Sequence, residues 1–125
     1  MRALVIDDSR VMRGVIRRIL EPYGFEVLEA QHGADGLAKL RSMAVPDMAF
    51  VDWNMPEMTG IEFIEHVREE DKYDSMAIVM VTTETEAHQM ERALEAGANE
   101  YLMKPFTAEA LKEKLAVLGF YETTP

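Results

Sequence analysis

The chain has 125 residues, enough for one domain around a single buried core, and it has no cysteines, which excludes disulfides and thiolate metal sites. Its formal net charge of −10 argues against direct binding to the phosphate backbone of a nucleic acid. No apolar run approaches the roughly 20 residues of a membrane helix, and the short N-terminal run is not a signal peptide because two acids end it at once. We therefore expect a cytoplasmic domain without membrane insertion.

The N-terminal third of the chain predicts a strand, a helix and a second strand. Residues 3–6 form a short apolar run that ends on two aspartates. Ser9 then stands at an N-cap position, and apolar residues recur with helical spacing from there to about Pro22. Residues 25–30 supply the second strand.

The middle of the chain repeats this alternation. Leucines with helical spacing predict a second helix, and Pro46 ends the connection that follows it. Residues 48–52 form a continuous apolar run that ends on Asp52, which predicts a strand buried on both faces. Thr59 begins a third helix, and Glu62 follows it at the spacing of a capping box.

The C-terminal part begins with a polar loop at residues 69–75 and a strand at residues 76–81. A fourth helix is predicted from Glu84 to Ala96, with Met90, Ala93 and Leu94 directed inward and Gly97 as its C-terminal cap. A last strand at residues 99–103 precedes a fifth helix. That helix has leucines at Leu111, Leu115 and Leu118.

Strand and helix therefore alternate five times with short connections, which is typical of an α/β, doubly wound, five-stranded parallel sheet with five helices. We assign residues 1–120 to one domain. The residues from Gly119 to Pro125 look like a tail, and we place residues 121–125 outside the domain.

Polar side chains follow four of the five predicted strands. The strand ends carry Asp7 and Asp8, Asp52, Thr82 and Lys104, and the carboxyl ends of parallel strands meet at one edge of the sheet. Each pair of carboxylates about 4 Å apart costs about 1–4 kcal/mol, and a hard cation such as Mg²⁺ relieves that cost. The alternative is that the acids lie apart in solvent and that Asp52 only caps a turn.

These residue types favour phosphoryl transfer. Asp52 would be the nucleophile, Lys104 a point charge for a phosphoryl oxygen and Thr82 a hydroxyl donor. No glycine-rich phosphate loop is present, so we do not expect a bound nucleotide.

The chain resembles the receiver domain of bacterial two-component response regulators from about residue 2 to residue 118. The resemblance rests on Asp7-Asp8, Asp52, Thr82-Thr83 and Lys104-Pro105-Phe106, together with the segment from Ala96 to Phe106. Each motif alone is weakly specific for the family, but the set as a whole is very specific. The resemblance implies a flavodoxin-like sheet with the strand order 2-1-3-4-5.

The resemblance also implies a role for each matching residue. Asp52 would accept a phosphoryl group from a phosphohistidine on a sensor histidine kinase or a histidine phosphotransfer protein. Mg²⁺ would be bound directly by Asp8, largely through water by Asp7, and also by Asp52 and the backbone carbonyl of Asn54. Lys104 would pair with the phosphoryl group, and its peptide bond to Pro105 would be cis.

The same resemblance predicts how a signal would leave the domain. Thr82 and Tyr101 would form the switch, and the face built by the fourth helix, the fifth strand and the fifth helix would change shape. We expect this face to control a downstream protein target, in a monomer or a phosphorylation-dependent dimer. Because the resemblance covers nearly the whole chain, we expect a stand-alone regulator, similar to the chemotaxis regulators of the family. The chain would then be a regulator that promotes its own phosphorylation and dephosphorylation, not an enzyme.

Three alternatives stay open. The chain is a receiver portion of a larger regulator, a phosphatase with an aspartyl nucleophile, or a binding module of the flavodoxin type. Haloacid-dehalogenase-type phosphatases need an acid two residues after the nucleophile, where this chain has Asn54. A flavodoxin-type module needs a phosphate loop rich in Ser, Thr and Gly after the first strand, where this chain has Asp7, Asp8, Ser9 and Arg10.

Overall fold

The computed structural model describes residues 1–83 and 87–121. Its centre is a sheet of five parallel strands in the order β2-β1-β3-β4-β5, which confirms the predicted fold class and strand order. The strands are β1 (Arg2–Ile6), β2 (Glu26–Ala30), β3 (Met48–Asp52), β4 (Ala77–Thr82) and β5 (Glu100–Met103).

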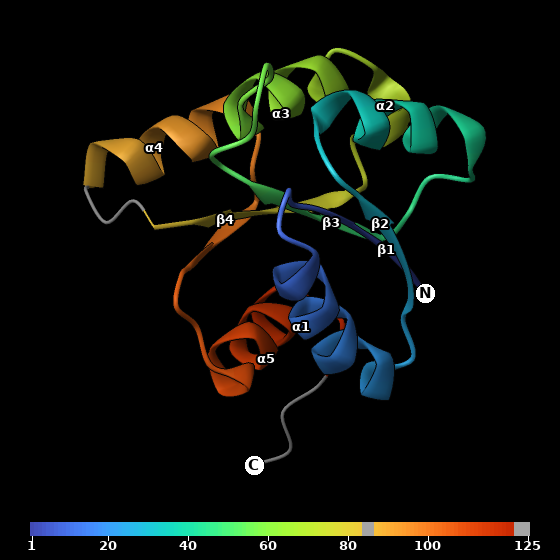
Figure 1. Ribbon diagram of the computed structural model, residues 1–125, viewed down its shortest axis with the longest axis vertical. Helices are drawn as coiled ribbons and strands as arrows, with labels where there is room; N and C mark the ends of the chain where they lie inside the picture. The colour runs from blue at the N-terminus through green and yellow to red at the C-terminus, as the bar shows by residue number, and fades with distance from the viewer. Residues whose placement is uncertain (84–86, 122–125) are drawn as a thin grey trace.

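Five α-helices cover the two faces of this sheet (Figure 1). They are α1 (Arg10–Leu20), α2 (Gly33–Ser42), α3 (Gly60–Arg68), α4 (Ala87–Ala96) and α5 (Ala108–Val117). The helices α2, α3 and α4 lie on one face, and α1 and α5 lie on the other. None of the described helices has the length and apolar character needed to cross a membrane.

Alternation along the strands divides the core into two layers. In β3, Val51 packs into the cluster beneath α2, α3 and α4, whereas its neighbour Phe50 packs into the cluster beneath α1 and α5. All five residues of β3 are buried, as expected for the central strand of a sheet covered on both sides.

The predicted helix caps are present. The Ser9 hydroxyl accepts a hydrogen bond from the Met12 N–H at 3.2 Å at the start of α1. Thr59 and Glu62 form the complete capping box of α3. Gly97 ends α4 with φ of +120°, a left-handed conformation that favours glycine.

Two details of the sequence interpretation are wrong. The loop at residues 69–75 contains a 3₁₀ turn, Asp71–Tyr73, which buries Tyr73 in the core. Leu94, predicted to face inward, is 47% exposed, whereas Ala93 is buried as predicted. Tyr121 packs on Tyr23, with their ring centroids 5.2 Å apart. Aromatic residues close to the chain end thus add to the α1–α5 layer.

Two predicted features lie outside the described residues. These are the start of the fourth helix at Glu84 and the last four residues of the tail, 122–125.

Candidate functional site

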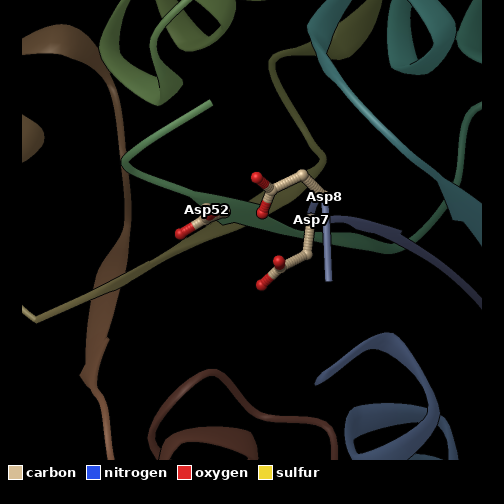
Figure 2. A group of neighbouring side chains, drawn as sticks. All are labelled: Asp7, Asp8 and Asp52. Atoms are coloured by element: carbon tan, nitrogen blue, oxygen red, sulfur yellow. The ribbon is translucent and has the colours of Figure 1, made fainter. Parts of the chain in front are cut away.

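The sheet register brings Asp7 and Asp52 side by side. The last paired residues of β1 and β3 are Ile6 and Val51, so the next position on each strand is an aspartate. Because side chains alternate along a strand, both aspartates project toward the α1–α5 side, whereas Asp8 leaves the chain on the other side. Figure 2 shows the three carboxylates together at this edge of the sheet.

The three acids form a compact cluster with one open side. Carboxylate oxygens of Asp7, Asp8 and Asp52 all lie within 4.8 Å of one another. Asp7 is 1% exposed and Asp52 is 5% exposed, but Asp8 is exposed. Asp7 and Asp52 are therefore buried in the protein, and the cluster is open to solvent on the side of Asp8.

Lys104 joins the two buried acids. Its Nζ lies 3.1 Å from Oδ2 of Asp7 and 3.1 Å from Oδ1 of Asp52. Lys104 follows β5, and the Lys104–Pro105 peptide bond is cis, as the resemblance implied. Asp7 and Asp52, which precede Lys104 by 97 and 52 positions in the chain, thus share its ammonium group.

Electrostatics within the cluster favour a cation. Burial raises the pKa of the Asp52 carboxyl, and the neighbouring charge of Asp7 raises it further, beyond what Lys104 offsets. Burial alone would lower the pKa of Lys104, but the hydrogen bonds to Asp52 and Asp7 together with the negative charges of these two residues outweigh burial, and that pKa is raised. One lysine therefore does not compensate all the negative charge that the fold collects here.

The backbone of Asp52 is in close contact with Gly60, the first residue of α3. A Cβ atom on Gly60 would lie 2.4 Å from the Asp52 carbonyl oxygen, so the first residue of α3 has to be glycine for this approach. The Gly60 N–H donates to the Trp53 carbonyl at 2.9 Å, and the buried Trp53 indole packs in the core. Asn54 follows with an exposed side chain.

The two residues predicted to form the switch lie on the same side of the sheet. Thr82 is the buried last residue of β4 and pairs with Met103, while Tyr101 pairs with Met80 two positions earlier. Tyr101 is half-buried, and the Lys114 ammonium lies 5.0 Å from the centroid of its ring. Thr82 and Tyr101 therefore stand on the neighbouring strands β4 and β5.

The structure also adds residues to which the sequence interpretation gave no role. The Nδ1 atom of His32 accepts the Asp35 N–H at 3.1 Å and caps α2. The guanidinium group of Arg13, on α1, donates to the Asp7 carbonyl oxygen at 2.7 Å. The spacing of Arg13 and Arg17, one turn apart on α1, was the available signal of a shared partner.

Comparison with known proteins places this arrangement in a family. Residues 3–116 match the response regulator receiver domain. The chemotaxis protein CheY1 of Helicobacter pylori is 44% identical over 119 residues, which cover 94% of this chain and 96% of that protein. The chemotaxis protein CheY homolog of Campylobacter jejuni is 47% identical over 121 residues, which cover 95% of this chain and 93% of that protein.

A solved structure agrees with these sequence matches. The chemotaxis protein CheY4 of Vibrio cholerae superposes with a TM-score of 0.87 at 36% identity, covering 94% of this chain and 97% of that chain. The fold, the sequence match and the relatives all lead to the same conclusion. The chain belongs to the response regulator receiver domain family and is a CheY-type receiver domain of two-component signalling.

Proposed function

We propose that the chain is a phosphorylation switch in which Asp52 accepts a phosphoryl group from a phosphohistidine. The donor would be a sensor histidine kinase or a histidine phosphotransfer protein. The observation that carries this proposal is the shared ammonium group of Lys104, bonded at 3.1 Å to Asp52 and to Asp7 inside an acid cluster. Membership of the receiver family supports it.

The acid cluster fits Mg²⁺ by the chemistry of its donors. Three carboxylates with oxygens within 4.8 Å of one another, open on the side of Asp8, suit a hard cation that keeps part of its water shell. We propose Asp8 as a direct ligand, Asp7 as a ligand largely through water, and Asp52 and the Asn54 carbonyl as the remaining ligands. When bound, Mg²⁺ would neutralise the carboxylates and the incoming phosphoryl oxygens.

In the proposed transfer step, Asp52 is the nucleophile and Lys104 contacts the phosphoryl group. A carboxylate oxygen of Asp52 attacks phosphorus, and the P–N bond to the donor imidazole breaks with its electron pair staying on nitrogen. The product is an acyl phosphate on Asp52. Lys104 already touches the Asp52 carboxylate, so its ammonium group is in place for a phosphoryl oxygen without a large movement.

We propose that the signal leaves through Thr82 and Tyr101. The Thr82 hydroxyl would donate to the new phosphoryl group, and the Tyr101 ring would turn into the space vacated on the same side of the sheet. The face of α4, β5 and α5 would then present a different surface to a protein target, or to a second copy in a phosphorylation-dependent dimer. This is a population shift driven by new contacts with the phosphoryl group.

A chemotaxis-type switch is the first candidate for the cellular role, because CheY relatives match this chain over nearly their whole length. We place it in the cytoplasm with its proposed kinase. The second candidate is a receiver portion of a larger regulator. A putative two-component system response regulator/GGDEF domain protein supports it, since that structure is 30% identical and this chain covers 48% of its length.

Intact-mass measurement tests the proposal. Incubation with Mg²⁺ and either acetyl phosphate or a phosphohistidine donor should add one phosphoryl group that is labile to base and maps to Asp52. Asp52→Asn should remove the modification, whereas Asp74→Asn, at an exposed position, should retain it. A stable modification on Ser, Thr or His, or none at all in the wild-type chain, would refute the switch.

A further inference from the structure

Every polar atom of Asp7 has a hydrogen-bond partner. Its N–H donates to the Ala30 carbonyl at 3.1 Å, and its carboxylate accepts the Ser9 N–H at 2.8 Å and the Lys104 ammonium at 3.1 Å. The carbonyl oxygen accepts from the guanidinium group of Arg13 at 2.7 Å. Two of these partners are backbone groups, the third is the Lys104 side chain, and the fourth is the side chain of Arg13 on α1.

Arg13 is itself fixed from the opposite side. Its Nε donates to one carboxylate oxygen of Glu29 on β2 at 3.0 Å, and its side chain is only 11% exposed. Arg17, one turn later on α1, pairs with the other oxygen of Glu29 at 2.8 Å. On the other side of β2, the Lys39 ammonium of α2 donates to the backbone carbonyl of Glu29.

The result is a continuous connection from β2 to the acid cluster. The guanidinium group of Arg13 spans the carboxylate of Glu29 and the backbone of Asp7, at the point where the chain turns from β1 toward α1. The position of the Asp7 carboxylate depends on the backbone that carries it. Because Lys104 bonds to Asp7 and Asp52 together, a shift of Asp7 would also disturb the group that faces the phosphoryl acceptor.

The geometry points to Arg13 as a positioning residue of the phosphoryl-transfer site. It acts through the Asp7 backbone, not by touching the phosphoryl group, and it sets how well the acid cluster binds a divalent cation and supports transfer to Asp52. This inference rests on the proposed function of Asp52. Arg17 has the same charge, the same helix and the same Glu29 partner, but its described bonds go to Glu29 alone.

Arg17→Gln is therefore the matched control for Arg13→Gln, since both remove one positive charge and one bond to Glu29. Mg²⁺ affinity is measured by Trp53 fluorescence, and Asp52 phosphorylation by acetyl phosphate is measured by intact mass across a Mg²⁺ titration. Acetyl phosphate avoids any effect of α1 on the docking of a protein donor. Urea unfolding records the stability of each variant.

Arg13→Gln should weaken Mg²⁺ binding and slow phosphorylation by about tenfold or more, the usual effect of removing a group that orients a metal ligand. Arg17→Gln should change both by less than about twofold at comparable stability, because it leaves the Asp7 backbone in place. Equal losses in the two variants would trace the effect to their shared partner Glu29 or to α1 as a whole, not to the bond with Asp7, and would overturn the inference. An unchanged Arg13→Gln would overturn it as well.

A second variant decides the question if Arg13→Gln does not fold. Arg13→Lys keeps the positive charge but lacks the planar guanidinium group that spans Glu29 and the Asp7 carbonyl, so its loss of Mg²⁺ affinity should exceed that of the matched Arg17→Lys. A smaller or equal loss would overturn the inference. If the wild-type chain binds Mg²⁺ but is not phosphorylated at Asp52, the proposed function fails, and the Mg²⁺ titrations still test the role of Arg13.

Discussion

Three aspartates with identical side chains stand at the site, and their surroundings give each a different property. Asp7 is buried and fully hydrogen-bonded, Asp52 is buried beside it with a raised pKa, and Asp8 is exposed. A fixed acid suits orientation, and an exposed acid suits contact with a hydrated cation. An acid of raised pKa beside a lysine is poised to form a new bond. Differences between the three aspartates should therefore be measurable one residue at a time.

At this scale we expect Asp52→Asn to stabilise the metal-free protein at pH 7, by about 1 kcal/mol in the free energy of unfolding. The native pKa of Asp52 is raised, first by burial and then by the charge of Asp7. Native Asp52 thus keeps its proton to higher pH than the unfolded chain, and stability falls as pH rises from the ordinary carboxyl pKa through the raised one. The advantage of Asn should vanish below the ordinary carboxyl pKa. Urea unfolding with a chelator present measures it.

Glu65→Gln is the control for this experiment, because Glu65 is exposed and the substitution changes the net charge equally. It should alter stability by less than about 0.5 kcal/mol. If Asp52→Asn proves less stable than the wild type at pH 7, the bond from Lys104 outweighs the repulsion and our reading of the electrostatics is wrong.

At the scale of elements, two glycines in helices should respond oppositely to the same substitution. A Cβ on Gly14 of α1 meets nothing within 4 Å, whereas a Cβ on Gly60 of α3 meets the Asp52 carbonyl at 2.4 Å. Gly14→Ala should raise the free energy of unfolding by about 0.5–1 kcal/mol through helix propensity. Gly60→Ala should lower it by about 1–3 kcal/mol and slow phosphorylation, because α3 must move away from β3.

Denaturant unfolding measures the stability of each variant, and the rate of reaction with acetyl phosphate measures phosphorylation of Asp52. A Gly60→Ala variant with unchanged stability and rate would mean that α3 and the end of β3 adjust independently. The close backbone approach would then have no part in positioning Asp52.

A second prediction at this scale concerns communication between β4 and β5. Thr82→Ala should leave phosphorylation of Asp52 largely intact but uncouple it from Tyr101, because the side chain proposed to move toward the phosphoryl group is gone. The NMR shifts of the Tyr101 ring, with and without beryllofluoride as a phosphoryl mimic, report the coupling. Wild-type shifts confined to the Asp52 pocket, with α4 and Tyr101 unchanged, would rule out this route.

For the whole molecule, we expect Mg²⁺ to raise thermal stability. A cation that binds only the folded chain stabilises it by mass action, by about 2.7 kcal/mol at a hundredfold excess over the dissociation constant. Asp8→Ala should abolish this gain, and relief of repulsion should make that variant at least as stable as the wild type without metal. Thermal unfolding monitored by Trp53 fluorescence measures both effects.

Asp71→Ala is the matched control, since Asp71 is an exposed aspartate outside the cluster, and it should keep the full response to Mg²⁺. A sodium salt of equal ionic strength separates specific binding from screening. A wild-type chain whose stability and fluorescence ignore saturating Mg²⁺ would contradict the metal site.

The sequence by itself determined the order and type of the elements, because apolar runs and helical spacing report which side of each element meets the core. It also determined that polar residues follow several strands, and parallel strands necessarily deliver such residues to one edge. The fold class and the meeting of Asp7, Asp8, Asp52 and Lys104 could therefore be predicted before the structure was known.

Only the tertiary structure decided which groups surround each acid. Nothing in the adjacent residues Asp7 and Asp8 tells the buried one from the exposed one, because that depends on the register of β1 against β3. The bond from Arg13 to Asp7, the approach of Gly60 to Asp52 and the burial of Tyr73 likewise depend on how separate elements pack. Periodicity reports the direction of a side chain from its own element, but it carries no information about what another element places there.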